Sequence, residues 1–175
     1  MVNRCAAGSI PYHSQRFWLT SVPTIIRPAQ RADIPFLAAA NAAMAWQTEG
    51  KRLDPERLAR GVAAVFDAPQ RGFYRIAEED GVALGCLLVT REWSDWRDGD
   101  WWWIQSVYVQ PAARRRGVFR ALYADVEAAA RAAGDVVGLR LYVECENERA
   151  QRTYAALGMA ETHYRLYERE FAADE

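Results

Sequence analysis

The chain has 175 residues, of which 51% are hydrophobic and 26% charged, and its 22 basic and 23 acidic side chains leave a net charge of −1. This length suits one domain with a sizeable core, and the composition excludes a wholly disordered chain. The near-zero net charge gives no electropositive surplus for nonspecific nucleic-acid binding. The 7 tryptophans are many for this length and require places to pack.

Cysteine and histidine usage indicates a reducing compartment. Cys5, Cys86 and Cys145 are widely spaced and form no Cys-x-x-Cys pair, and the chain has 2 histidines, so neither disulfides nor a metal site are expected. No apolar run approaches the roughly 20 residues of a membrane span, and polar residues interrupt any secretory signal near the start. We expect a cytoplasmic protein without membrane contacts, with residues 1–22 as a flexible N-terminal extension and residues 23–175 as a single domain.

The first part of the domain is predicted to be one strand followed by two helices. Residues 24–27 are rich in β-formers and end at Pro28, after which Asp33 can N-cap a helix. Asp54 and Pro55 then open a second helix, in which apolar residues recur at helical spacing.

Three strands are predicted next. Residues 73–78 and 82–90 flank Asp80-Gly81, a dipeptide typical of tight hairpins. A polar loop marked by tryptophans is expected from Glu92 to Asp100, and residues 101–109 form the third strand. Strict alternation along it predicts one face with Trp103, Gln105, Val107 and Val109 and the other with Trp102, Ile104, Ser106 and Tyr108.

The C-terminal half alternates helices and strands. A long amphipathic helix closes at Gly134, residues 139–145 form a strand, and Asn147 caps a last helix that ends at Gly158. A final strand is expected over residues 162–171. Because helices and strands interleave throughout, the sequence predicts one α/β (α+β) domain without a repeat or linker.

An arginine-rich turn joins the 101–109 strand to the long helix, with the sequence Gln110-Pro111-Ala112-Ala113-Arg114-Arg115-Arg116-Gly117-Val118-Phe119. The unpaired N–H groups and the macrodipole of a helix N-terminus attract an anion, and a glycine lets backbone approach a phosphate closely. The alternative is a solvated basic turn that merely starts a helix.

With its preceding strand, this turn resembles motif A of the GNAT superfamily of acyl-CoA-dependent N-acyltransferases, in which an apolar-x-Val-x-Pro run precedes Arg/Gln-x-x-Gly-x-Gly/Ala and a helix. Arg114 to Val118 fit, whereas Phe119 replaces Gly or Ala; its side chain either crowds the pyrophosphate or points into the core. The resemblance covers about residues 24–171 and implies a mixed twisted sheet of about six or seven strands, with splayed fourth and fifth strands, flanked by about four helices.

The resemblance implies that acetyl-CoA is the co-substrate. The pantetheine arm would hydrogen-bond to the fourth-strand backbone and to Asn147, and the turn amides would hold the pyrophosphate. The residues implied in cofactor binding are Val107, Tyr108, Val109, Arg114, Arg115, Arg116, Gly117, Val118, Phe119, Asn147 and Tyr154.

By the same resemblance, Tyr154 would lie beside the thioester and protonate the departing thiolate. A phenol suits this role, since it is neutral at pH 7, has one O–H and has a pKa near that of a thiol. The alternative is a core tyrosine on the apolar stripe of its helix. Asn147 is also a preferred N-cap residue whatever binds nearby, and the two roles are compatible.

The sequence does not identify the general base. Many family members carry a glutamate on the fourth strand shortly before the motif, where this chain has Gln105-Ser106. Glutamine cannot accept the proton but can position water. A relay could then end at Glu92, Glu144 or Glu49, and the alternative for each is a solvated surface charge.

Substrate contacts are expected from the turn after the first helix, with Glu49, and from the 92–100 loop, with Trp93, Asp95 and Trp96. Indole faces beside carboxylates attract cations, which suits an amine carrying positive charge. The alternative is that the tryptophans only pack the sheet and the acidic loop is solvated.

These features predict an N-acetyltransferase that moves an acetyl group from acetyl-CoA to a primary amine, of a small molecule or a peptide, by direct attack in a ternary complex. The alternative is a non-catalytic acyl-CoA-binding regulatory or interaction module, favoured by the missing fourth-strand carboxylate and by Phe119. Nucleic acid is not an expected partner, because acidic residues surround the tryptophan loop, and no histidine near Cys145 activates it as a nucleophile. A homodimer is an expectation from the resemblance.

Overall fold

The computed structural model describes residues 23–171, in which four helices accompany one five-stranded sheet of order β1-β2-β3-β4-β5. The sheet is antiparallel from β1 to β4, and β5 adds to β4 in parallel. The strands are β1 (Ile25–Pro28), β2 (Phe73–Glu79), β3 (Val82–Ser94), β4 (Gly99–Val109) and β5 (Val136–Arg140), and the helices are α1 (Ile34–Glu49), α2 (Pro55–Asp67), α3 (Val118–Ala133) and α4 (Glu148–Ala156). The predicted fold class is confirmed, with five strands in place of six or seven. The predicted extension over residues 1–22 lies outside the described residues.

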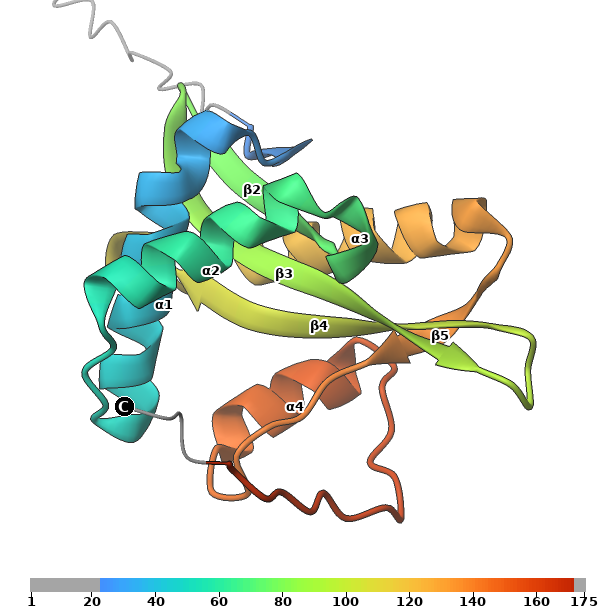
Figure 1. Cartoon of the computed structure of the whole chain (residues 1–175). Coiled ribbons are helices and arrows are strands. Elements are labelled where there is room, and N and C mark those ends of the chain that lie inside the picture. The colour runs from blue at the N-terminus through green and yellow to red at the C-terminus, as the bar shows by residue number, and fades with distance from the viewer. Residues whose placement is uncertain (1–22, 172–175) are drawn as a thin grey trace, which may run out of the picture.

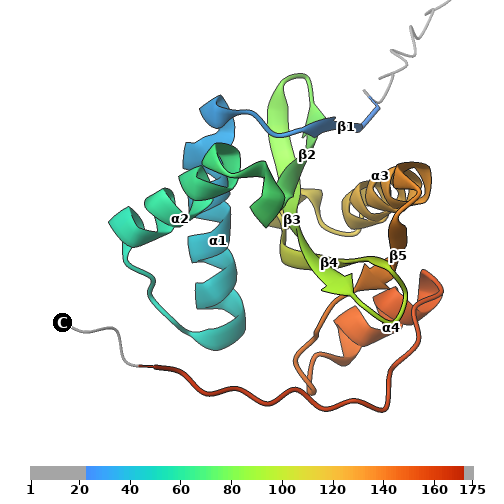
Figure 2. The same cartoon turned by 45° about the vertical axis from the view of Figure 1, so that its right-hand side comes forward.

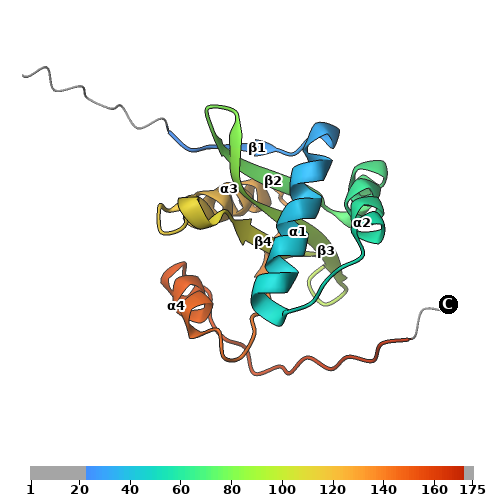
Figure 3. The same ribbon diagram turned by 90° about the vertical axis from the view of Figure 1, so that its left-hand side faces the viewer.

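The helices cover the two faces of the sheet unequally. Helices α1 and α2 lie on one face and α3 on the other, while α4 lies beside the open end of β4 and β5 (Figures 1 and 3). The hydrophobic cluster under α1 and α2 includes the buried Leu37, Val62 and Ile76. The cluster under α3 includes the buried Leu87 and Val126. No residue of α4 is fully buried, so this helix depends least on the core.

Local signals in the sequence set several element boundaries. Asp54 caps α2 by accepting the Glu56 N–H at 2.9 Å, and Pro55 fills the first position of that helix. Asp80 and Gly81 both have positive φ in the β2–β3 turn, at 49° and 73°, as a tight hairpin requires. These predicted features are confirmed.

Strict alternation along β4 is wrong, because the strand contains a β-bulge at Ser106. Ser106 has a φ of +50°, and the β3–β4 register shifts where it lies. One extra residue in β4 reverses the face of the sheet to which each later side chain of the strand points. Val107 and Val109 therefore pack in the α3-side cluster with Trp102 and Ile104, and Tyr108 packs under α1 and α2.

The polar loop predicted from Glu92 to Asp100 is mostly a hairpin. β3 continues to Ser94 and β4 begins at Gly99, leaving only residues 95–98 as a turn. Trp93 lies opposite Asp100, and Glu92 lies opposite Trp101. Cross-strand pairing thus continues the ladder through residues whose polarity suggested a loop.

Two strands predicted in the C-terminal half differ from the structure. β5 occupies residues 136–140 rather than 139–145. Pairing with β4 begins at Val136 and ends at Arg140, so the chain after Arg140 has no partner in β4. Residues 162–171, predicted as a final strand, are extended but lack a ladder partner among the described residues. Both predicted segments contain strand-forming residues, but most of their length has no neighbouring strand to pair with among the described residues.

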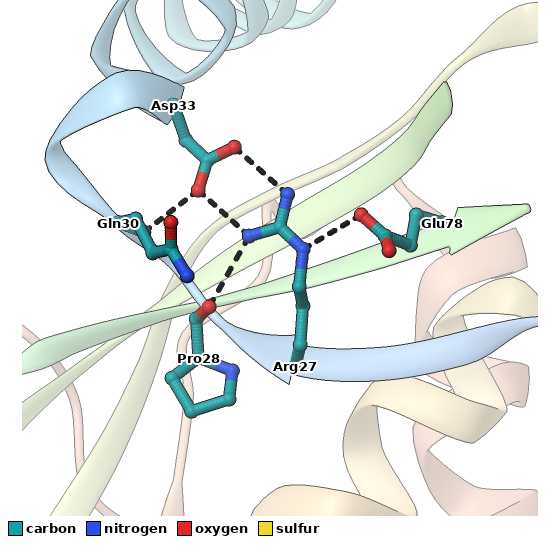
Figure 4. Close-up of polar contacts among 5 residues, drawn as sticks. All are labelled: Arg27, Pro28, Gln30, Asp33 and Glu78. Carbon is teal, nitrogen blue, oxygen red and sulfur yellow. Dashed lines mark hydrogen bonds and ion pairs between the residues drawn. The ribbon is translucent and has the colours of Figure 1, made fainter. Parts of the chain in front are cut away.

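A charged cluster fastens β1 to β2 and to the start of α1 (Figure 4). Arg27 donates to both carboxylate oxygens of Asp33, at 2.7 and 2.9 Å, and to Glu78 at 2.6 Å. Asp33 also accepts the Gln30 N–H at 2.7 Å, so it does not cap α1 as predicted. The Arg27 hydrogen bond is the main influence that lowers the Asp33 pKa, and the same carboxylates raise the pKa of Arg27.

Replacing Arg27 with Gln is expected to lower the free energy of unfolding by about 1–3 kcal/mol at neutral pH, because two poorly exposed carboxylates lose their charged donor. The lowered Asp33 pKa means that this contribution is present above the unfolded pKa of about 4 and is lost as the pH falls through the folded value. Urea titrations at pH 7 and pH 3 measure the change.

Arg31→Gln is the matched control, because Arg31 pairs with Asp67 while both side chains are more than 60% exposed, at 62% and 61%. That variant is expected to change stability by less than about 1 kcal/mol. Equal losses for the two variants, or an Arg27 loss that is unchanged at low pH, would contradict the assignment.

Candidate active site

The turn from β4 to α3 leaves a row of backbone amides without a partner inside the helix. Arg115 and Gly117 have φ values of +65° and +84°, and the Ala121 N–H makes the first helical bond, to the Gly117 oxygen at 3.0 Å. The amides of Val118, Phe119 and Arg120 precede that bond and carry the positive end of the helix dipole. A side chain built on Gly117 would meet nothing within 4 Å. The turn is therefore open, as an anion site at a helix N-terminus requires.

Two of the three turn arginines brace the turn against other elements. Arg114 donates to the Val109 carbonyl at 3.0 Å and to Gln47 of α1 at 2.5 Å. Arg116 forms an ion pair with Glu79 at the end of β2, at 2.5 Å. Among the described residues the exposed Arg115 side chain has no hydrogen bond or ion pair. Of the three, Arg115 is therefore the one available to a ligand.

Phe119 points away from the turn amides. Its ring lies 6.3 Å from Tyr123 and 5.7 Å, edge to face, from Tyr154, as centroid distances. The side chain packs at the margin of the α3-side core. The alternative in which it points into the core is the one observed, so its side chain does not crowd the turn.

Strands β4 and β5 separate beside this turn. Their parallel pairing runs from Asp100 with Val136 to Trp103 with Arg140 and goes no further. Residues 104–109 of β4 therefore have no strand partner on that edge among the described residues. This confirms the predicted splay, and it leaves the backbone edge of Val107, Tyr108 and Val109 without a strand partner on that side.

Helix α4 borders the separated strands (Figure 2), and it carries the predicted Tyr154 and is capped by the predicted Asn147. Tyr154 is half-buried against Phe119, and burial raises the pKa of its phenol. Asn147 caps the helix, with its Oδ1 accepting the Ala150 N–H at 3.1 Å. The capping alternative is thus observed, and the amide nitrogen of Asn147 is left as a donor.

Gln105 and Glu92 both have partners of their own. The Gln105 amide donates to the Thr90 hydroxyl at 2.7 Å. Glu92 accepts the Trp103 indole N–H and pairs with Arg140 at 3.1 Å. Glu92 is thus held as an ion-paired carboxylate.

Arg140 was not singled out in the sequence, and it organises an aromatic cluster on the α1 side of β4. Its guanidinium carbon lies 4.0 Å from the Trp101 ring centroid and 5.8 Å from that of Trp103. Trp103 also contacts Tyr142, at a centroid distance of 6.0 Å. No local motif marks Arg140, because the cluster forms only once β5 pairs with β4.

The predicted substrate residues do not gather at the turn. Trp93 and Trp96 are 63% and 84% exposed, and Asp95 accepts the Trp96 N–H at 2.9 Å. Their hairpin precedes β4, which has 11 residues. At about 3.4 Å per residue, the length of that strand, roughly 35 Å, separates the hairpin from the Gly117 turn. Glu49 pairs with Lys51 at 2.7 Å, at the end of α1.

Some broader properties of the described residues bear on the chemistry. Within residues 23–171, no cluster of three or more His, Cys, Asp or Glu side chains could hold a metal ion. None of the helices there has the length and apolar character needed to cross a membrane.

Comparison with known proteins agrees with this arrangement. The family model for the acetyltransferase (GNAT) family matches residues 36–159. A solved structure described as a possible acetyltransferase from Clostridium difficile 630 is 39% identical, covers 86% of this chain and 99% of its own, and superimposes with a TM-score of 0.81. No curated protein matches.

More distant solved structures share the fold. An aminoglycoside N-acetyltransferase in complex with CoA is 20% identical, covers 86% of this chain and 97% of its own, and has a TM-score of 0.71. A transcriptional regulator from Bacillus halodurans C-125 is also 20% identical, covers 85% of this chain and 100% of its own, and has a TM-score of 0.73.

Gly117→Ala is expected to weaken coenzyme A binding about tenfold, because a side chain in the left-handed region costs roughly 1–2 kcal/mol and the turn must move its amides to relieve that strain. Isothermal calorimetry measures the affinity. Gly134→Ala is the matched control, since Gly134 closes the same helix with a φ of +79° and equally open surroundings. Unchanged affinity in Gly117→Ala, or equal weakening in both variants, would contradict the site.

Proposed function

Because the chain belongs to the GNAT acetyltransferase family, we propose that it transfers the acetyl group of acetyl-CoA to a primary amine by direct attack within a ternary complex. The observation that carries this proposal is the contact between Phe119 and Tyr154, 5.7 Å apart as ring centroids. Phe119 contributes its backbone amide to the open turn, and Tyr154 contributes its phenol beside the gap between β4 and β5.

The residues around the gap fit the three parts of the co-substrate. The amides of Val118, Phe119 and Arg120 suit pyrophosphate oxygens, and Arg115 supplies a free guanidinium for a further phosphate. The unpaired backbone edge of β4 and the Asn147 amide nitrogen suit the amide groups of the pantetheine arm. The bound thioester supplies the electrophilic carbonyl carbon.

The chemical step forms one bond and breaks another. The neutral amine forms a C–N bond to the carbonyl carbon, and the C–S bond breaks. Tyr154 donates its proton to the departing sulfur, and the proton lost by the amine passes through water to solvent. The phenol suits this donation because burial keeps it neutral to higher pH.

Deprotonation of the amine does not require a carboxylate on β4. The Gln105 amide nitrogen is fixed by Thr90, which leaves the Gln105 carbonyl oxygen to orient a water molecule. Glu92 is engaged by Arg140 and Trp103, so we assign it to structure rather than to the proton relay. The free thiols Cys86 and Cys145 suit a reducing, cytoplasmic compartment.

Because Glu92 is engaged by Arg140 and Trp103, a second candidate function is also favoured. In this candidate the protein binds acyl-CoA but does not transfer the acyl group. This candidate requires binding but no release of coenzyme A in the presence of amines. Thiol release from acetyl-CoA, measured with a panel of small amines and peptides, separates the two. Binding without release for every acceptor would favour the module, and absence of binding would reject both.

Tyr154→Phe is expected to lower kcat by about 100-fold or more while leaving acetyl-CoA affinity unchanged, since only the proton donor is removed. Because burial raises the pKa of Tyr154, the wild-type rate should persist up to the ordinary phenol value of about 10 and fall only above it. The variant should lack that alkaline fall. A pH–rate profile with the best acceptor measures both effects.

Tyr123→Phe is the matched control. Tyr123 also contacts Phe119, and burial also raises its pKa, but it lies on α3 away from the gap. This variant is expected to keep kcat within about twofold of wild type. A loss shared by both variants would indicate a packing effect and would remove the acid role from Tyr154.

A further inference from the structure

The side chains around Arg140 lie at the point where β4 and β5 separate. Arg140 is the last residue of β5 that pairs with β4, and its partner there is Trp103. Trp101 and Trp103 are on the side of β4 that α1 and α2 cover elsewhere, but neither belongs to the hydrophobic cluster beneath those helices. The apex of the splay therefore carries aromatic side chains that these helices do not bury.

Gln105 is on the same face of the sheet as Trp103. Thr90 of β3 pairs with Trp103, and its hydroxyl accepts the Gln105 amide. Gln105 itself pairs with Leu88, which packs under α1 and α2. Two residues span about 7 Å along a strand. The aromatic side chains at the apex therefore begin next to the residue assigned above to orienting water for the amine.

The apex is also the end of β4 toward which the acyl group of the co-substrate would point. The Gly117 turn, assigned above to the pyrophosphate, follows one end of the unpaired stretch 104–109, and the apex lies at the other end. A pantetheine arm that follows this stretch leads from the turn toward the apex. The acceptor amine must therefore approach from the side chains gathered there.

Trp103 and Tyr142 form an aromatic wall at the apex. Their ring centroids lie 6.0 Å apart, with the rings tilted by 50°. Tyr142 is 61% exposed, so much of its ring surface is open to a ligand. Aromatic rings pack favourably against one another in tilted or offset arrangements. The wall therefore suits an aromatic group of an acceptor.

The charges at these rings favour an anionic group of a ligand over a cationic one. The Arg140 guanidinium carbon already lies over Trp101, at 4.0 Å from the ring centroid, and Arg97 lies 5.3 Å from the same ring. Glu92 is the carboxylate that pairs with Arg140. Two guanidinium groups thus meet one carboxylate at the rings, and the place that a ligand cation would take over an indole is filled.

Arg140 keeps hydrogen-bond donors for such an anion. Both of its hydrogen bonds to Glu92 come from Nη1, at 3.1 and 3.2 Å. A guanidinium has five N–H groups in a planar fork, and within residues 23–171 neither Nε nor Nη2 of Arg140 has an acceptor. The side chain is 30% exposed. The remaining N–H groups therefore match the two oxygens of a carboxylate.

We propose that the acceptor is a primary amine that carries a carboxylate and an aromatic group, as an aromatic amino acid does. Its carboxylate binds Nε and Nη2 of Arg140, its ring packs against Trp103 and Tyr142, and its amine is directed toward the water held by Gln105. The inference rests on the proposed function, which it deepens by naming the class of acceptor.

Isothermal calorimetry on the full chain with coenzyme A present tests the carboxylate contact. The probes are L-phenylalanine and L-phenylalaninamide, which has the same shape but no carboxylate. Arg140→Gln is expected to weaken phenylalanine binding about tenfold or more, because a charge-assisted pair of hydrogen bonds is lost. Binding of the amide should change less than about twofold.

Glu92→Gln is expected to act in the opposite direction. The new side chain can still accept the Trp103 indole N–H, as Glu92 does, but its neutral amide no longer competes for the charge of Arg140. Phenylalanine should therefore bind more tightly than to the wild type. Opposite changes in the two variants separate a direct contact from a general loss of structure, which would weaken binding in both.

Arg91→Gln is the matched control for the charge. Arg91 precedes Glu92 in β3 and pairs with Trp102, so its side chain lies on the other face of the sheet. This variant should bind phenylalanine within about twofold of the wild type. For the aromatic contact, Tyr142→Ala should weaken phenylalanine binding several-fold and leave the weaker binding of L-alanine unchanged, and the exposure of Tyr142 means that the variant should fold.

Three results would overturn the inference: a wild type that does not bind phenylalanine, an Arg140→Gln variant that binds both probes as the wild type does, or equal weakening of both probes. Coenzyme A release from acetyl-CoA separates it from the proposed function. Arg140-dependent binding of phenylalanine without release would reject acetyl transfer but keep the carboxylate site. Acetylation of the amide alone would keep acetyl transfer and reject the acceptor class.

Discussion

The separation of β4 from β5 is the constraint on which the candidate site depends. The two strands pair only as far as Trp103 and Arg140, and beyond that point the β4 edge is free and α4 can approach it. Trp101 lies against Gly138 so closely that an added Cβ would come within 2.5 Å of its ring. The absence of a side chain at Gly138 thus lets the strands pair where they do, next to the cluster that Arg140 and the tryptophans form.

The β-bulge at Ser106 anchors β4 in the region where this strand is separated from β5. It turns Val107 and Val109 into the α3-side core and Tyr108 under α1 and α2, so the far end of β4 is anchored on both faces while its edge stays unpaired. Anchored backbone with a free edge is a suitable surface for an extended ligand. The same strand then leads directly into the Gly117 turn, so pantetheine and pyrophosphate would be recognised by consecutive backbone.

The residues of the proposed acyl-transfer site come from β4, the start of α3 and helix α4. Helix α4 supplies Tyr154, and Asn147 is its N-cap residue. The β3–β4 hairpin, with Trp93 and Trp96, lies at the start of β4, and the Gly117 turn follows the other end of that strand. Of the other predicted residues, Glu92 lies next to this indole-rich hairpin rather than beside the turn.

The sequence by itself determined the helices, the Asp80-Gly81 hairpin and the Gly117 turn, because caps, turn dipeptides and periodicity act over a few residues. It also placed Tyr154 and Asn147 correctly on the last helix. Only the tertiary structure decided the Ser106 bulge, the end of β5, the partners of Glu92 and the unpaired state of residues 162–171. Each of these depends on which strand lies alongside, and pairing between distant segments leaves no local pattern in the chain.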